Sequence, residues 1–441
     1  MSKKARPMAG PAAVLIAAGL LFSAPALART MAARPGATVA LENGLAVILR
    51  PVPSASSVAL VVLFDIGEDQ DPAGASGLAH LVEHLYLTAA AGSEKSRNFE
   101  DFVARHPLGW NAQTGNRYTA LSVVFPPENL EAELSEAAAR MKDIRVAAGD
   151  LDREKPRVIQ ELANMYGGIP VLAGLNCGRQ VARPSPSGGR KGGRENEVAA
   201  ITLDQVKDRL SSYYRPANAT LVLAGAMSAQ NVPPLISRLF TDLPRGKKIP
   251  EIPSAKNSPR EAGRIRKIAH NKPDAAGLAF LVFAAPQPAE PLYPAFLLLA
   301  ARLNLKAWRS GGNSSTLHFA PLDDPEILGI STPLRPAEDG KAAINRLRIF
   351  VSESLRQPKN PADVAAAKNF YGFFFGFPGF PEAAFSQNLY GLAFSLARRH
   401  QLKIDGTRLA DALGNVTAED LSAAARLFGV DNSAAVVVEG R

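Results

Sequence analysis

The stretch Gly77–Leu87, GLAHLVEHLYL, decides how the rest of the chain is interpreted. Its apolar residues recur at the spacing of a helix that buries one face. Those residues are Leu78, Leu81, Val82 and Leu85. His80, Glu83 and His84 stand at positions i, i+3 and i+4, so a helix projects all three from one side. The stretch therefore predicts a helix that brings two imidazoles and a carboxylate together.

Two imidazoles one helical turn apart can bind one zinc ion, which in catalytic sites takes three protein ligands and a water. Zinc lowers the pKa of that water to about 7, and a neighbouring carboxylate such as Glu83 can take its proton. The alternative is a core helix with incidental histidines, whose buried imidazoles would need hydrogen-bond partners. Zinc is preferred over other divalent metals because of the ligand types. The motif favours a hydrolytic zinc site.

A third ligand is expected from another helix, predicted over residues 150–165. Glu161 lies in this helix, and Glu154 lies seven residues earlier, on the same side. By spacing alone, an acid pair of this kind is equally typical of a solvated helix face.

The H-x-x-E-H motif and a glutamate that follows it after 76 intervening residues together resemble the pitrilysin/insulinase family of inverted-zincin metallopeptidases. Further segments resemble landmarks of that family over nearly the whole chain. They are LENGLAVIL (41–49), YYRPANATLVLAG (213–225) and VTAEDL (416–421).

The resemblance implies a role for each site residue. His80, His84 and Glu161 would be the zinc ligands and Glu83 the general base. Glu154 would orient the site from behind the ligands. The implied activity is that of a zinc-dependent endopeptidase acting on extended peptides or unfolded polypeptides.

GWNAQT, Gly109–Thr114, resembles the edge strand of the family, in which Asn111 and Ala112 would face the bound peptide. Pairing there uses backbone hydrogen bonds, which hold an extended substrate with little regard to its sequence. The alternative for Asn111 is a turn residue after Gly109.

The second half departs from the family pattern. Family members carry an arginine and a tyrosine, seven residues apart, that stabilise the tetrahedral intermediate. Counting onward from GGNSSTL (311–317), these positions fall at Leu322 and Gly329, which have no suitable side chain. Because some bacterial members of the family work as pairs, we hypothesise that this chain is the zinc-bearing subunit of a heterodimer. A homologous subunit would then supply the Arg/Tyr pair.

Two other functions remain open. The chain could be a non-hydrolytic peptide-binding or scaffold subunit of a peptidase-like complex, with zinc kept for structure. It could also process one dedicated peptide, as in cofactor maturation, although no residue identifies such a substrate.

The first residues predict an export signal peptide, residues 1–28. A basic start (Lys3, Lys4 and Arg6) precedes an apolar run over 11–22 and a small-residue cleavage site that ends at Ala28. The alternative, a membrane anchor, needs about 20 apolar residues. We therefore expect a periplasmic or secreted protein with no membrane span after signal cleavage.

A chain of 441 residues is expected to form two domains. We predict an N-terminal catalytic zinc-binding domain (33–245), a linker rich in Pro, Lys, Ser and Gly (246–263) and a C-terminal pseudo-repeat domain (264–441). Residues 201–225 and 416–440 both read as helix, turn and strand, which indicates duplication. The expected fold class is α+β, with two similar α/β-sandwich halves in tandem. The resemblance implies that they form half of a clamshell.

The net charge of +9 falls to +6 without residues 1–28, and part of it lies in two basic stretches, 188–194 and 258–267. Nucleic-acid binding is not expected, because no aromatic-interleaved basic motif accompanies the charge. Solvated loops are the favoured interpretation. The single cysteine, Cys177, excludes a disulfide within the chain and is expected in the core. FYGFFFGFPGF (370–380) predicts either a chamber or interface lining or a buried helix and turn.

Overall fold

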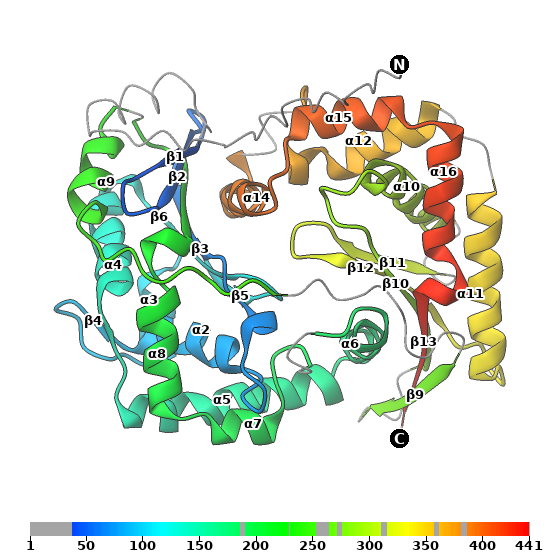
Figure 1. Ribbon diagram of the computed structural model, residues 1–441, viewed down its shortest axis with the longest axis horizontal. Helices are drawn as coiled ribbons and strands as arrows, with labels where there is room; N and C mark the ends of the chain where they lie inside the picture. The colour runs from blue at the N-terminus through cyan, green and yellow to red at the C-terminus, as the bar shows by residue number, and fades with distance from the viewer. Residues whose placement is uncertain are drawn as a thin grey trace, which may run out of the picture.

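The structure is a computed structural model in which two sheets face each other across the molecule (Figure 1). It describes residues 38–185, 190–228, 230–252, 264–270, 276–309, 315–356, 361–380 and 386–440. The predicted signal peptide and most of the predicted linker lie outside these ranges. No helix in the described ranges has the length and apolar character needed to cross a membrane.

The first half forms a six-stranded sheet in the order β1-β2-β8-β3-β6-β5. Its strands are β1 (Thr38–Ala40), β2 (Ala46–Pro51), β3 (Val58–Phe64), β5 (Trp110–Thr114), β6 (Thr119–Phe125) and β8 (Ala219–Gly225). Strand β2 runs parallel to β8, and the other pairs are antiparallel. Every residue of β3 is buried, because the strand is central and both sheet faces are covered. Strand β5 forms one edge of the sheet, as the resemblance implied.

Helices from the first half cover one face of this sheet. They are α2 (Leu78–Thr88), α3 (Phe99–Arg105), α4 (Leu130–Lys142), α5 (Ala148–Gly167), α7 (Glu195–Ala200), α8 (Leu203–Tyr213) and α9 (Val232–Phe240). Short 3-10 segments η1 (Glu68–Gln70), η2 (Pro127–Asn129) and η3 (Pro216–Asn218) and the small pair β4 (Ala90–Ala91) and β7 (Ile144–Arg145) complete this half. Their apolar faces form one core with the sheet.

The second half repeats the plan with a five-stranded sheet in the order β11-β12-β10-β13-β9. Its strands are β9 (Ile265–His270), β10 (Leu278–Ala284), β11 (Thr316–Ala320), β12 (Asp324–Pro333) and β13 (Ser433–Gly440). Its helices are α10 (Tyr293–Arg309), α11 (Gly340–Leu355), α12 (Pro361–Phe375), α15 (Gly406–Asn415) and α16 (Ala418–Ala425), followed by η4 (Arg426–Phe428) and η5 (Val430–Asn432). Again one pair, β9 with β13, is parallel and the rest are antiparallel. The predicted α+β fold with two similar halves is confirmed.

Each half also packs one helix onto the sheet of the other half. Helix α14 (Leu389–Gln401) buries Leu392 and Leu396 against the first sheet. Helix α6 (Pro170–Ala182) covers one face of the second sheet, where a Cβ on Gly174 would lie 2.3 Å from Phe280. In Figure 1 both helices lie between the two halves. Because the two halves exchange these helices, each sheet is packed partly by residues of the other half. The domain limits 33–245 and 264–441 stay a prediction.

The structure also describes Cys177 and the aromatic segment 370–380. Cys177 lies on α6, half-buried against the second sheet. Within FYGFFFGFPGF, α12 ends at Phe375 and a turn follows. Tyr371 and Phe375 are buried, whereas Phe370 and Phe374 are 38% and 39% exposed. The segment is therefore a helix and a turn with mixed burial.

Candidate metal centre

A glycine and a buried aspartate fix the N-terminus of the histidine-bearing helix α2. Gly77 precedes the helix with a φ of 92°, a left-handed conformation that glycine adopts without steric cost. The Asp71 carboxylate accepts hydrogen bonds from the backbone N–H groups of Gly77 (2.9 Å) and Ala79 (3.0 Å), which have no partner within the helix. Burial raises the pKa of Asp71 to about 7, although its ion pair with Arg209 opposes the rise. These contacts fix the position of the helix.

His80, His84 and Glu161 converge at one point between α2 and α5. The Nε2 atoms of His80 and His84 lie 3.5 and 3.4 Å from the Oε2 atom of Glu161. Two atoms bound to one tetrahedral zinc at about 2.1 Å lie about 3.4 Å apart. Among the described residues these three form the group of His, Cys, Asp and Glu side chains suited to a metal ion, with all ligand atoms within 4.8 Å of one another. The two nitrogens and one oxygen fit zinc.

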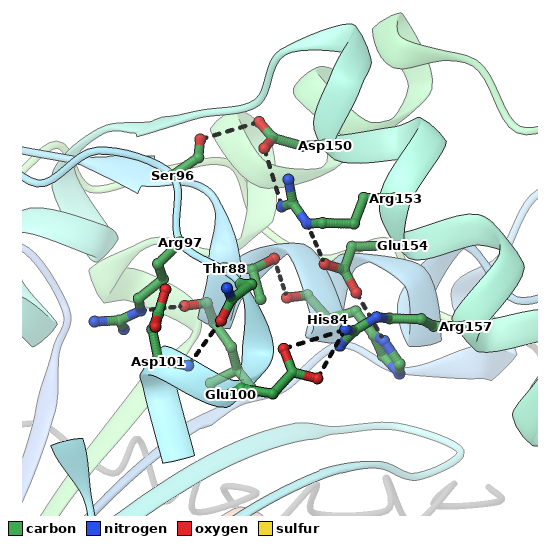
Figure 2. Close-up of polar contacts among 12 residues, drawn as sticks. His84, Thr88, Ser96, Arg97, Glu100, Asp101, Asp150, Arg153, Glu154 and Arg157 are labelled. Atoms are coloured by element: carbon green, nitrogen blue, oxygen red, sulfur yellow. Dashed lines mark hydrogen bonds and ion pairs between the residues drawn. The ribbon is translucent and has the colours of Figure 1, made fainter. Parts of the chain in front are cut away.

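Glu154 contacts His84 on the side of the ring away from Glu161: the Nδ1 atom of His84 lies 3.4 Å from the Oε2 atom of Glu154. Arg153 donates to Glu154 (2.9 Å) and to Asp150 (3.0 Å), and Asp150 accepts from Ser96 (3.3 Å). Figure 2 shows Glu154 pointing toward His84, with Arg153 between the two acids. Glu154 is 1% exposed. This arrangement fixes the ring of His84 and leaves its Nε2 atom for a metal.

The Nδ1 atom of His80 lies 3.3 Å from the carbonyl oxygen of Gly192. Gly192 and Gly193 are buried and adopt positive φ values of 78° and 102°. A Cβ on Gly193 would lie 2.5 Å from the Cα atom of Gly77, so the loop packs directly on the start of α2. The expectation that residues 188–194 form a solvated loop is therefore wrong for Gly192 and Gly193, because only glycine allows this close approach.

The electrostatics of the site follow from carboxylates that surround the imidazoles. Burial lowers the pKa of His84, but hydrogen bonds to Glu154 and Glu161 outweigh it and raise this pKa to about 9. The pKa of His80 is also raised, because Glu161 and Glu83 outweigh its burial. The hydrogen bonds to both histidines hold the pKa of Glu161 well below its usual range. A divalent cation would meet strong negative potential here.

Glu83 lies on the same side of α2 as the histidines and is 7% exposed. The hydroxyl group of Thr114 on β5 donates to its Oε2 atom at 2.5 Å. Glu83 and Glu161 both line a cleft of about 640 Å³. The carboxylate is therefore oriented and also open to a substrate.

The cleft also contains the predicted substrate-binding residues. Asn111 and Ala112 on β5 line it, together with Trp110. The Asn111 side chain donates to the Tyr390 hydroxyl on α14 at 2.6 Å and to Gln113 at 3.0 Å. Asn111 is therefore part of a strand and not a turn, because β5 begins at Trp110 and pairs with β6.

The structure places Leu322 and Gly329 away from this cleft. Leu322 is buried in the core of the second half. Gly329 lies on β12 beneath α6, where a Cβ would lie 2.3 Å from the Leu175 side chain. A tyrosine does not fit at Gly329.

Sequence reasoning missed Thr114, Gly192 and Gly193 as parts of the site. Thr114 belonged to the quoted strand GWNAQT, and its alternation with Ala112 could have indicated that both face α2. The glycine pair was a signal for close backbone approach, but its partner is 112 residues away in the sequence.

Two models of one peptidase family match the chain. The model described as Insulinase (Peptidase family M16) matches residues 46–166, which carry the metal centre. The model described as Peptidase M16 inactive domain matches residues 200–370. Together they cover more than half of the chain.

Curated relatives match at low identity. The zinc protease PqqE of Helicobacter pylori is 26% identical over 208 residues, which are 47% of each chain. An uncharacterized zinc protease of Rickettsia bellii is 23% identical over 47% of this chain and 50% of its own length. The matched segments thus span about half the length of these curated relatives.

Solved structures share the fold over most of this chain. A protease from Helicobacter pylori has a TM-score of 0.73 at 19% identity, covering 91% of this chain and 99% of that one. The periplasmic protease PqqL from Escherichia coli has a TM-score of 0.70 at 16% identity, covering 92% of this chain and 47% of that one. With the family matches over both halves, these findings show that the chain belongs to the insulinase family of peptidases, family M16.

Proposed function

We propose that this protein is a zinc-dependent endopeptidase that hydrolyses extended peptides. The observation that carries the proposal is the convergence of His80, His84 and Glu161 at the separations of a tetrahedral zinc site. Glu83 lies beside this triad and opens on the same cleft. The relatives named zinc proteases support the same chemistry.

His80, His84 and Glu161 would hold the zinc ion, which when bound supplies Lewis-acid activation of a water molecule. Glu83 takes a proton from the attacking water and delivers it to the leaving amine. Thr114 keeps the Glu83 carboxylate turned toward the cleft. Glu154 holds the His84 ring by its Nδ1 atom, so that the Nε2 atom stays directed at the site.

The substrate is an extended segment of a peptide or an unfolded polypeptide. Strand β5 lies at the sheet edge and borders the cleft, so its free backbone groups can pair with an added strand. Leu87, Phe99 and Trp110 give the cleft an apolar wall beside the metal centre. This wall favours substrates with a large apolar side chain next to the scissile bond.

The chain acts as the zinc-bearing subunit of a heterodimer. Leu322 and Gly329 supply no hydrogen-bond donor side chain, and α6 closes the space over Gly329. The chain matches about half of the Escherichia coli PqqL chain, which leaves room for a second half on another subunit. Mixing the chain with a homologous subunit that carries the Arg/Tyr pair should raise peptide turnover. Equal turnover with and without that subunit would refute the heterodimer.

The protein is exported, with residues 1–28 removed. The basic, apolar and small-residue order of that segment supports this proposal. The printed description of PqqL as periplasmic agrees with it. Sequencing the N-terminus of the protein recovered from its native host tests the cleavage after Ala28.

The decisive experiment compares residues 29–441 with the Glu83→Gln variant on a quenched fluorescent peptide library. The variant keeps the zinc ligands and should bind one zinc ion per chain, but hydrolysis should fall at least about a hundredfold because the base is lost. Cleavage that is unchanged in the variant would refute the mechanism. Zinc binding without cleavage by the wild-type chain, alone or with its partner, would favour the alternative scaffold function.

A further inference from the structure

Each of the two histidine ligand candidates on α2 has an oxygen atom beside its Nδ1 atom, but the two oxygens come from different kinds of group. Both imidazoles direct Nε2 toward Glu161. His84 has the Glu154 carboxylate at its Nδ1 atom, whereas His80 has the Gly192 carbonyl oxygen. Histidine ligands generally require such a partner to fix the ring and its tautomer.

Gly192 is itself held by a carboxylate. Its N–H group donates to Oε1 of Glu68 at 2.8 Å. The backbone N–H of Glu68 donates in turn to the carbonyl oxygen of Gly115, one residue beyond Thr114. Glu68 is 9% exposed, so little water competes for the hydrogen bond to Gly192.

The N–H and carbonyl groups of Gly192 belong to two adjacent peptide planes, which its own φ and ψ angles join. Gly192 has a φ of 78°, and a Cβ there would lie 2.5 Å from the Leu162 side chain, one residue after Glu161. Because the residue is packed between α2 and α5, a contact that fixes its N–H group also restrains the direction of its carbonyl group.

We propose that Glu68 is a positioning residue for the zinc site: it fixes Gly192, so that the Gly192 carbonyl oxygen orients the His80 imidazole. The proposal rests on the zinc site of the proposed function. Glu68 does for His80, through one residue, what Glu154 does for His84 directly. The relay also connects the metal centre to the segment that continues from the substrate strand β5.

Two substitutions distinguish the effect of the length of the Glu68 side chain from the effect of its charge. Glu68→Asp keeps the charge but withdraws the carboxylate by one methylene, so it should lose the hydrogen bond to Gly192. Glu68→Gln keeps the length and an acceptor oxygen, so it should preserve that bond without the charge. Glu326→Gln is the matched control, because Glu326 is a buried carboxylate paired with Arg179 that has no described contact with α2 or Gly192.

The measurement is the rate of zinc release to a colorimetric chelator from residues 29–441. Glu68→Asp should release zinc about tenfold faster than wild type, the range for the partner of a metal ligand. Glu68→Gln and Glu326→Gln should stay within about twofold of wild type. Glu154→Ala, the positive control, removes the acceptor at the His84 Nδ1 atom and should release zinc faster.

Release at the wild-type rate by Glu68→Asp would overturn the proposal, as would equally fast release by Glu68→Asp and Glu68→Gln. A wild-type chain that binds no zinc would instead refute the proposed function. If a Glu68 variant does not fold, hydrogen exchange at the Gly192 amide of the zinc-loaded wild type decides. The proposal requires this amide to be strongly protected by its bond to Glu68, and exchange at the rate of an unprotected amide would overturn it.

Discussion

Glu83 depends on Thr114 for its orientation, and this makes Thr114 a sensitive residue of the site. The hydroxyl group donates at 2.5 Å to a carboxylate that is almost wholly buried. A hydrogen bond to a charged group contributes about 1.5–3 kcal/mol. The bond also restrains the carboxylate, which must be oriented toward the water that it deprotonates.

Thr114→Val removes the donor at nearly constant volume. We expect peptide turnover to fall roughly 10- to 100-fold, because an unrestrained Glu83 spends less time in the reactive orientation. Zinc content should not change, since Thr114 contacts no ligand candidate. The measurement is kcat on a fluorescent peptide, with zinc quantified in the same sample.

Thr114→Ser is the matched control, because it keeps the hydroxyl group and should keep most of the turnover. If the serine and valine variants lose turnover equally, the hydrogen bond does not orient the base and the loss comes from packing of β5.

At the scale of single residues, spacing within one helix was informative and contacts between distant segments were not. His80, Glu83 and His84 could be grouped because helical periodicity fixes which side chains share a face. Glu161 was reached only through the resemblance, since nothing in a sequence fixes which face of α5 meets α2. Gly192 could not be reached at all, because its role depends on a peptide orientation within a loop.

Helices α2 and α5 are the elements that the metal would join. His80 and His84 come from α2 and Glu161 from α5. A metal bound across two elements stabilises the folded state by mass action, since the unfolded chain does not present the three ligands together.

Zinc in thousandfold excess over its Kd should therefore stabilise the first half by about 4 kcal/mol. Trp110 in the first half reports this unfolding once Trp308→Phe has removed the second tryptophan, and Trp308 is 78% exposed. Adding a chelator should reverse the gain. Glu161→Ala in the same background should show no response to zinc, and an equal response there would place the metal elsewhere.

Helix α4 is attached to the segment after α2 by a buried charge network. Glu136 accepts hydrogen bonds from Arg97 and, at 2.9 Å, from Arg140, and its side chain is 22% exposed. Burial acts to raise the pKa of Glu136, but the two guanidinium groups outweigh it and lower this pKa to about 2. Burial lowers the pKa of Arg140, which still stays charged throughout the acidic range.

A depressed carboxylate pKa gives stability that is present above the unfolded value of 4.5 and is lost as the pH falls toward 2. Between pH 6 and pH 3 the wild type should therefore lose about 2 kcal/mol more than Glu136→Gln, which cannot titrate. Urea titrations with Trp110 as reporter measure the difference. Parallel pH profiles for the two proteins would show that Glu136 is not held by the arginines.

At the scale of elements, the sequence predicted whether a segment is a helix or a strand better than it predicted the residues at which the element begins and ends. Threonine is a preferred N-cap residue, and the Thr202 side chain accepts from the backbone N–H of Gln205 at the start of α8. Helical periodicity over residues 228–240 predicts a helix, which begins only at Val232, because Pro233 and Pro234 suit a first turn and not a helix interior. Helix α6 was not predicted. Its Gly174 and Gly178 bring the helix close to the second sheet.

The whole molecule is held together by the reciprocal placement of α6 and α14. Both have apolar faces that periodicity can detect, but periodicity does not say which sheet a helix will cover. Duplication was visible because helix, turn and strand recur in order. The exchange of helices was not, because it is a property of contacts between segments more than 150 residues apart, as between β3 and α14.

The exchange predicts that the two halves stay associated after the chain is cut between them. A protease site engineered into the predicted linker, between residues 253 and 260, should give two fragments that elute together, because each contributes a helix to the core of the other.

Leu392→Asp and Leu396→Asp place charges in the buried contact of α14 and should make the cut fragments separate. Two exposed positions on the same half, Ile349→Asp and Val430→Asp, are the control and should leave the cut protein intact. Size-exclusion chromatography distinguishes the outcomes. Fragments that separate without any substitution would mean that the halves are joined mainly by the chain, and that the cleft beside the Tyr390–Asn111 contact can open as one half moves.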